Sequence, residues 1–199
     1  MSRLKRVMTA VVAVSLLAPL APSAAQATTR VSDPYVTLHV DSVNGSGCPT
    51  GSSVVTAVPD QTAFTLSFSK FRTYGGGYMS CVVSINVSVP SGWTYAVYEV
   101  DNRGYGLLDA GASGRLMMSS WFTGFPWTLR ADQTFKGPFD DLWQTTSAAS
   151  SLTYSPCGAS ANLTLNNTLR VSGPPTSSME LSTQDLRAST VFRLRWRQC

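Results

Sequence analysis

Alternation of apolar and polar positions is clearest in residues 81–89, where every second side chain is apolar. A period of two places successive side chains on opposite faces of a β-strand. Pro90 and Gly92 then indicate a turn, because proline presets φ and glycine accepts a positive φ. Residues 93–100 are rich in β-branched and aromatic side chains and predict the return strand of a hairpin. This hairpin is too apolar to be stable alone, so other strands must cover it.

Similar patterns predict further strands at residues 35–40, 53–58, 62–68, 105–112, 115–125, 127–131, 162–171 and 190–197. We expect a turn at residues 101–104 and a loop from Gly137 to about Trp143, while residues 177–186 fit either a strand or one helical turn. About nine to eleven strands, with no long helical period, predict an all-β fold. The predicted architecture is a single-domain antiparallel β-sandwich, jelly-roll-like in its connections.

The first 27 residues have the features of a signal peptide. Arg3, Lys5 and Arg6 form a positive segment, residues 7–20 an apolar run, and Ala25-Gln26-Ala27 a cleavage site. The apolar run is too short for a typical membrane span. We therefore expect a secreted, extracellular domain over residues 28–199, with no membrane contact after signal cleavage.

Removal of the predicted signal peptide also lowers the net charge of the chain. The leader contains three of the 15 basic residues and none of the 11 acids, so the mature chain has a net charge near +1. The basic character of the full chain is therefore poor support for nucleic-acid binding, and we expect no nucleic-acid partner. The length fits one domain, which we expect to be a monomer.

Four cysteines, Cys48, Cys81, Cys157 and Cys199, predict two disulfides in an exported protein. Three pairings are possible. We favour Cys48–Cys81 and Cys157–Cys199, because each closes one contiguous segment and the second ties down the C-terminus. Each bond is expected to stabilise the fold by roughly 4 kcal/mol in the chain-entropy description. With no C-x-x-C and one histidine, we predict no metal site or cofactor.

Several short segments together resemble the secreted domain of unknown function 4360 family. They are residues 45–49 (GSGCP), 64–69 (FTLSFS), Cys81, 90–93 (PSGW), 103–105 (RGY), 156–158 (PCG) and 196–199 (WRQC). They occur in the family's order and span nearly the whole mature chain. The resemblance implies an exported, disulfide-bonded single domain of bacteria and fungi with no assigned activity. It implies no catalytic residue.

Candidate catalytic groups are few. Ser113 lies in a glycine-containing segment that is one residue too short for a nucleophile elbow, and His39, the one histidine, lies within a predicted strand. A glycosidase needs two positioned carboxylates. The candidates are Glu99, Asp101, Asp109, Asp140 and Asp141. The adjacent pair Asp140 and Asp141 also fits a calcium ligand or, more simply, an exposed loop. We assign no catalytic residue.

Aromatic residues are the most suggestive group. The candidate ligand-binding rings are Tyr74, Tyr78, Trp121, Trp127 and Trp143. Such rings either stack on the apolar C–H faces of sugars or fill the core of the sandwich. Arg193, Arg195 and Arg197 alternate along the last predicted strand opposite Phe192, Leu194 and Trp196. These arginines either bind anions or form a charged face that discourages edge pairing.

These observations favour a non-catalytic module that binds polysaccharide or cell-envelope material. One alternative is a secreted, carboxylate-dependent glycan hydrolase or lyase. Another is a protein-binding effector or inhibitor, which a flat apolar patch without a cleft would favour.

Overall fold

The computed structural model describes residues 36–181 and 190–199, which belong to one compact unit. The predicted signal peptide lies outside the described residues. Within these residues, all twelve regular elements are β-strands. The described residues therefore contain no helix that is long and apolar enough to cross a membrane.

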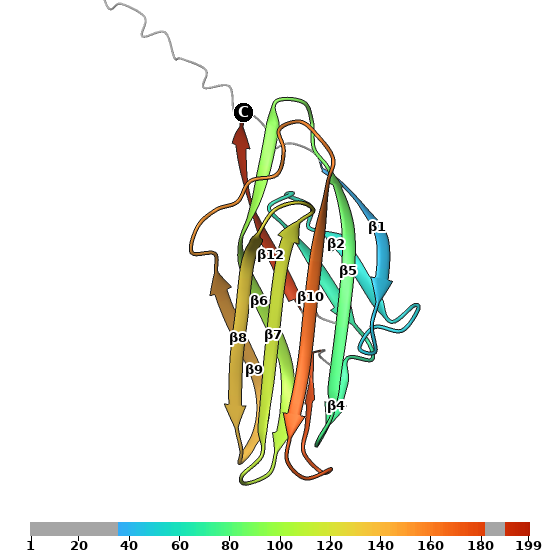
Figure 1. Cartoon of the computed structure of the whole chain (residues 1–199), viewed down its shortest axis with the longest axis vertical. Helices are drawn as coiled ribbons and strands as arrows, with labels where there is room; N and C mark the ends of the chain where they lie inside the picture. The colour runs from blue at the N-terminus through green and yellow to red at the C-terminus, as the bar shows by residue number, and fades with distance from the viewer. Residues whose placement is uncertain (1–35, 182–189) are drawn as a thin grey trace, which may run out of the picture. The chain divides into compact units, whose positions relative to one another are not determined.

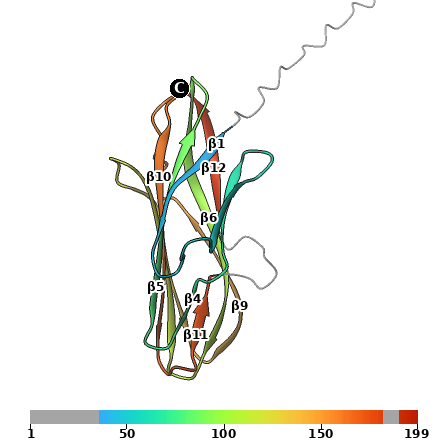
Figure 2. The same cartoon turned by 90° about the vertical axis from the view of Figure 1, so that its right-hand side faces the viewer.

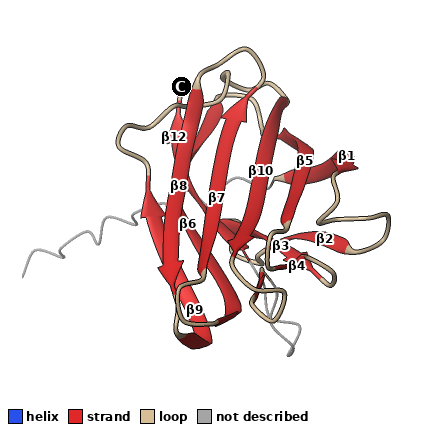
Figure 3. Ribbon diagram, turned by 60° about the horizontal axis from the view of Figure 1, so that its bottom comes forward, coloured by secondary structure: helices blue, strands red, loops and turns tan. Residues whose placement is uncertain are grey.

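Five antiparallel strands form the sheet that we call the front sheet (Figures 1 and 3). Its order is β1 (Thr37–Asn44), β5 (Tyr78–Ser88), β10 (Ala161–Ser172), β7 (Ser113–Phe122) and β8 (Trp127–Lys136). The neighbours β5 and β10 are far apart in the sequence, so the sheet is held together by non-local pairing.

The second sheet, which we call the back sheet, lies behind the first (Figure 2). Its order is β2 (Ser53–Ala57), β3 (Ala63–Phe68), β12 (Thr190–Gln198), β6 (Trp93–Leu108), β11 (Ser178–Glu180) and β4 (Arg72–Tyr74). The remaining strand, β9 (Phe139–Ala148), pairs with the other side of β6. The long β6 pairs first with β12 and then with β11 along one side.

The core lies between the sheets, as period-two alternation predicts. Ile85 and Leu165 point inward from the front sheet and are fully buried. Phe64 and Phe192 stack on each other from the back sheet, with ring centroids 4.8 Å apart. Tyr95 of the back sheet meets Phe122 of the front sheet edge to face at 5.3 Å. The predicted antiparallel β-sandwich is confirmed.

Both favoured disulfides are present. Cys48–Cys81 joins the loop after β1 to β5, and Cys157–Cys199 joins the loop before β10 to the C-terminal residue. The first bond is buried in the core, whereas the two cysteines of the second are exposed.

The predicted turn at residues 101–104 is wrong, because β6 continues through it without a break. Polar side chains there find partners within the back sheet: Asp101 accepts hydrogen bonds from Arg193 and Thr146. Gly104 marks a close approach and not a turn. A Cβ at this position would lie 2.0 Å from the carbonyl oxygen of Glu180 and 2.3 Å from the ring of Trp143.

The predicted loop from Gly137 to about Trp143 is also wrong. Gly137 and Pro138 alone separate β8 from β9, and β9 then runs to Ala148. The strand was hard to recognise from alternation because Trp143 is the one buried residue of β9. The ambiguous segment at residues 177–186 contains the short strand β11, and its residues 182–186 lie outside the described residues.

Candidate functional site

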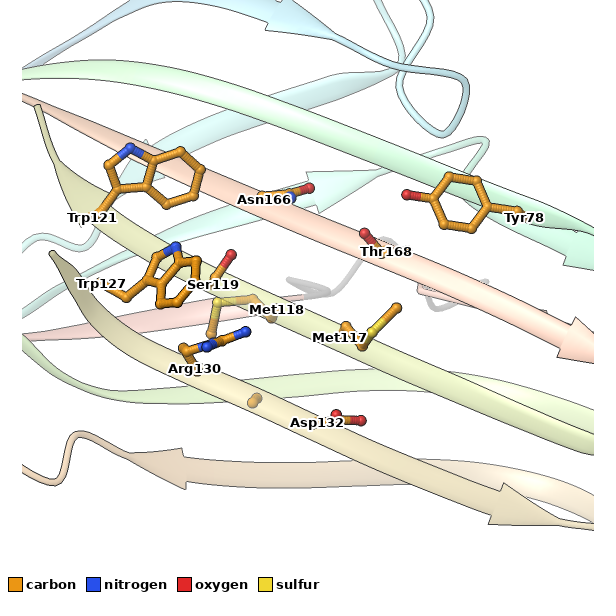
Figure 4. A pocket seen from close by; sticks show the side chains of 11 residues that line it. Tyr78, Met117, Met118, Ser119, Trp121, Trp127, Arg130, Asp132, Asn166 and Thr168 are labelled. Carbon is orange, nitrogen blue, oxygen red and sulfur yellow. The ribbon is translucent and has the colours of Figure 1, made fainter.

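A trough of about 690 Å³ lies on the outer face of the front sheet (Figure 4). Side chains from β5, β7, β8 and β10 line it. Continuous strand pairing holds all four elements in place, and it is interrupted only by a register shift between Ser120 and Trp121 in the β7–β8 pair.

Two tryptophans dominate one end of the trough. Trp121 on β7 and Trp127 on β8 lie directly opposite each other in the register. Trp127 is 56% exposed and Trp121 is half-buried. Both indoles also line a neighbouring hollow of about 350 Å³, together with Phe125 and Pro126 of the β7–β8 turn. The aromatic surface therefore continues past the end of the trough.

A β-bulge exposes Trp127. In β8, Leu129 and Ala131 face the core, so strict alternation would bury Trp127 beside them. The register shifts by one residue between Ser120 and Trp121, and the shift turns Trp127 outward and Thr128 inward. The buried hydroxyl of Thr128 bonds the Ser120 hydroxyl at 2.8 Å and donates to the Ser120 carbonyl at 2.9 Å.

Polar side chains cover the middle of the trough. Ser119 lies between Arg130 of β8 and Asn166 of β10 in one row across the sheet. In the next row, Met117 lies between Asp132 and Thr168. The amide oxygen of Asn166 is buried without a hydrogen-bond partner, and in Figure 4 the side chain of this residue lies between the tryptophans and Thr168. The trough thus combines rings with short hydroxyl and amide groups.

Both charged side chains that line the trough, Arg130 and Asp132, contact other side chains of the front sheet. The guanidinium carbon of Arg130 lies 3.8 Å from the centroid of the Trp127 ring, a cation–π contact. Asp132 accepts two hydrogen bonds from Arg115, one of them from Nε at 2.7 Å. The hydrogen bonds from Arg115 lower the pKa of Asp132. Asp132 is the one acidic side chain among the described residues that line the trough, and it stays ionised at neutral pH.

Three of the five predicted ligand-binding rings meet here. Tyr78, Trp121 and Trp127 all line the trough, and Tyr78 is 59% exposed at the end away from the tryptophans. Tyr74 is exposed, but it belongs to β4 of the back sheet and does not line the trough. Trp143 is 5% exposed and packs against Phe135, with ring centroids 5.2 Å apart.

The three alternating arginines of β12 lie on the outer face of the back sheet. Arg193 forms ion pairs with Glu99 at 2.9 Å and with Asp101 at 2.7 Å. Arg195 lies over the ring of Tyr98 and Arg197 over that of Tyr154. Each cation already has a partner, and anion binding by these arginines stays a prediction.

The candidate catalytic carboxylates do not form an open pair. Glu99 and Asp101 share one face of β6, as expected, but both are bound to Arg193. Burial alone would raise the pKa of Asp101, and the hydrogen bonds from Thr146 and Arg193 outweigh that effect and lower it. The pKa of Asp109 is lowered by hydrogen bonds from Thr176 and Ser177. A general acid requires the opposite shift.

The remaining candidates are dispersed. Asp140 accepts a hydrogen bond from Tyr105, while Asp141 accepts one from the backbone N–H of Leu142 at 2.7 Å. His39 on β1 is separated from Ser113 on β7 by two intervening strands. Within residues 36–181 and 190–199, no three His, Cys, Asp or Glu side chains converge in the manner of metal ligands.

Sequence reasoning missed the residues that surround the rings, chiefly Met117, Arg130, Asp132, Asn166 and Thr168. Alternation along β7 and β10 does place Met117 and Asn166 on outward faces. It cannot show that β10 lies between β5 and β7, which brings these faces together.

Known proteins give few functional clues. An "Uncharacterized secreted protein" of Arthroderma benhamiae is 29% identical over 168 residues, covering 78% of this chain and 68% of the relative. This relative and the two disulfides agree with the location that the leader predicts, and the protein is secreted.

Among solved structures, TmCBM61 in complex with β-1,4-galactotriose aligns at 12% identity over 79% of this chain and 88% of that one, with a TM-score of 0.32. The family 11 carbohydrate-binding module of Clostridium thermocellum, in complex with a mixed-linked tetrasaccharide, aligns at 12% identity over 75% and 88%, with a TM-score of 0.19. Superpositions this loose carry no argument about function. Residues 34–199 match the family described as "Domain of unknown function (DUF4360)", to which the chain therefore belongs.

Proposed function

We propose that the protein is a non-catalytic module that binds polysaccharide in the trough of the front sheet. The observation that carries the proposal is the pair of opposed indoles, Trp121 and Trp127, at the mouth of a hollow floored by hydroxyl and amide groups.

The chemistry of the lining suits a sugar chain. The C–H face of a pyranose ring is apolar and packs against an indole, while its hydroxyls need hydrogen-bond partners around the rim. Ser119, Asn166 and Thr168 supply such groups beside the rings, and Asn166 has an unpaired amide oxygen. Binding sites generally combine apolar surface with a few placed polar groups in this way.

The arrangement also suits an extended ligand. Trp121 lies six residue steps along β7 from Arg115, whose neighbour in the row, Arg170, lies opposite Tyr78. At about 3.3 Å per residue, that separation is roughly 20 Å along the strands. Because the side chains stand on paired strands, little ordering is required when a ligand binds, which favours affinity.

Retention on polysaccharides tests the proposal. The wild-type protein, Trp121→Ala and Trp127→Ala are assayed on cellulose, chitin and peptidoglycan, and in affinity gels with soluble galactan, mixed-linkage glucan, xylan and polygalacturonate. We expect wild-type retention on at least one polymer and a loss of affinity of about tenfold or more in each variant, typical of a central aromatic contact.

Tyr74→Ala is the matched control, because Tyr74 is 54% exposed but lies outside the trough. It should bind as the wild type does. Absence of retention on every polymer, with circular dichroism showing the fold intact, would contradict the proposal. Unchanged binding by both tryptophan variants would contradict it equally.

A further inference from the structure

Two arginines face each other at the end of the front sheet that is distant from the tryptophans. Arg170 of β10 lies directly opposite Arg115 of β7, and on its other side it lies opposite Tyr78 of β5. Like charges in directly opposed positions destabilise a sheet. The arrangement therefore costs stability unless a negative charge lies close to both guanidinium groups.

Arg115 has such a charge, but Arg170 does not. Arg115 is bound to Asp132, and Arg130, the third arginine of this sheet, lies over the ring of Trp127. The side chain of Arg170 is exposed, and within the described residues it has neither an acidic partner nor an aromatic one. Among the described arginines of this face, it is the one whose guanidinium has no acidic or aromatic partner in the described part of the chain.

A separate hollow of about 200 Å³ lies between these two arginines. Its lining consists of Arg115, Arg170, Ser113, Thr134 and Ser172. All five side chains can donate hydrogen bonds, and none is acidic. Lys136 of β8 lies opposite Ser113 in the next row and adds a third positive charge nearby. Guanidinium groups bind carboxylate and sulfate through two parallel hydrogen bonds, which matches this set of donors.

The hollow adjoins the trough. Asp132 lines the trough, its partner Arg115 lines the hollow, and Tyr78 borders Arg170 from the trough side. A chain that lies along the sheet from the tryptophans toward Tyr78 therefore reaches the unpaired arginine. A neutral sugar would leave that guanidinium without a partner, whereas an acidic sugar would pair with it.

We propose that the hollow between Arg115 and Arg170 binds an anionic substituent of the polysaccharide, a carboxylate or a sulfate, so that the preferred ligands are acidic polysaccharides. This inference rests on the proposed function, since it concerns the same bound chain. The tryptophans supply the affinity that all polysaccharides share, and Arg170 supplies the preference for the acidic ones.

The test compares three soluble polymers: polygalacturonate for carboxylate, carrageenan for sulfate, and neutral galactan. Affinities are measured by isothermal titration calorimetry for the wild type, Arg170→Gln, Arg170→Lys and Trp127→Ala. Arg195→Gln is the matched control, because Arg195 is an exposed arginine of the back sheet whose guanidinium contacts only a ring in the described residues.

We expect the wild type to bind at least one acidic polymer more tightly than galactan, with an affinity that falls as salt is added. Arg170→Gln should weaken acidic binding about tenfold, the usual effect of losing a charge-assisted hydrogen bond, and leave galactan binding unchanged. Arg170→Lys should retain part of the preference, and Arg195→Gln all of it. The acidic polymer that loses affinity identifies the substituent.

Equal wild-type affinity for all three polymers would overturn the inference, as would acidic binding that Arg170→Gln does not change or that Arg195→Gln weakens equally. In those cases a loss of binding in Trp127→Ala would still support the trough. If Arg170→Gln weakened acidic binding while Trp127→Ala changed nothing, anion binding in the hollow would be supported and polysaccharide binding on the tryptophans of the trough would be refuted. Absence of binding to all three polymers would refute the inference, and the retention assays on the wider set of polymers would then decide the proposed function separately.

Discussion

Arg130 lies over the indole of Trp127, with its guanidinium carbon 3.8 Å from the ring centroid. The contact covers one face of the most exposed tryptophan of the trough and restricts how that ring can turn. A ring whose orientation is already set loses less entropy when a ligand stacks on it. The arginine is therefore a positioning residue for the proposed sugar contact.

Replacing Arg130 should weaken polysaccharide binding and lower the stability of the fold only slightly. An exposed cation–π contact contributes about 0.5–1 kcal/mol, so Arg130→Gln should lower affinity roughly two- to fivefold. Calorimetric titration with a retained polymer measures the affinity, and thermal unfolding should show a Tm that is lower by no more than about 2–4 °C. Arg197→Gln is the control, because Arg197 has the same 3.8 Å contact with Tyr154. Equal effects of the two variants would argue against a positioning role.

Thr128 should stabilise the bulge that exposes Trp127. Its buried hydroxyl bonds to Ser120 and stabilises the register shift that exposes Trp127. Thr128→Val removes these bonds and leaves the Ser120 hydroxyl unpaired in the core, which should cost about 1–2 kcal/mol of unfolding free energy. Acrylamide quenching of tryptophan fluorescence should also fall if Trp127 turns inward. Thr56→Val, at an exposed position of β2, should change neither measurement.

A side chain at Gly104 should lower the stability of the fold strongly. A Cβ there would overlap the backbone of Glu180 and the ring of Trp143, and the backbone cannot move without breaking the pairing of β6 with β11. Gly104→Ala should lower the unfolding free energy by about 3 kcal/mol, at the upper end of overpacking effects. Gly106→Ala is the matched control, because its Cβ would meet no backbone atom and would contact the side chains of Phe139, at 3.0 Å, and Trp143, at 3.7 Å. Urea denaturation of both variants should show the larger loss at Gly104.

The protein should lose stability in acid because Asp101 becomes protonated. Its pKa is lowered in the folded protein, so its contribution is present above the unfolded-state pKa and is lost as pH falls through the folded-state value. Asp101→Asn should therefore cost on the order of 2 kcal/mol at pH 7 and less and less below about pH 4. Urea denaturation at several pH values measures this difference. Asp141→Asn, at an exposed carboxylate with no ion pair among the described residues, should show no such trend.

Sequence reasoning predicted an element correctly where the pattern lies within that element, and it failed where the structure depends on distant residues. Residues 81–89 and 190–197 were assigned correctly because alternation repeats every two residues and can be read from neighbours. The turn predicted at residues 101–104 failed because Asp101 and Gly104 resemble turn residues, and their actual partners, Arg193 and Trp143, are far away in the sequence.

The same limit applied to the candidate site. Tyr78, Trp121 and Trp127 were identified as rings that could bind a ligand, but nothing local distinguished Trp127 from Trp143. One lies at a bulge and is exposed, while the other packs under β6 and is buried. The role proposed for Arg170 was not recognised because it depends on Arg115 in the neighbouring strand.

The sequence alone determined that this chain forms alternating strands with one apolar face each, and it pointed to the two pairings of its cysteines. These properties follow from nearby residues and from the cost of exposing apolar surface. Only the tertiary structure decided which outward faces became neighbours, through the order β5–β10–β7–β8, and which tryptophan a register shift turned toward solvent. The strand order depends on pairing between β5, β10 and β7, which are distant in sequence, and the register shift depends on the pairing of β7 with β8, which alternation within a single strand does not encode.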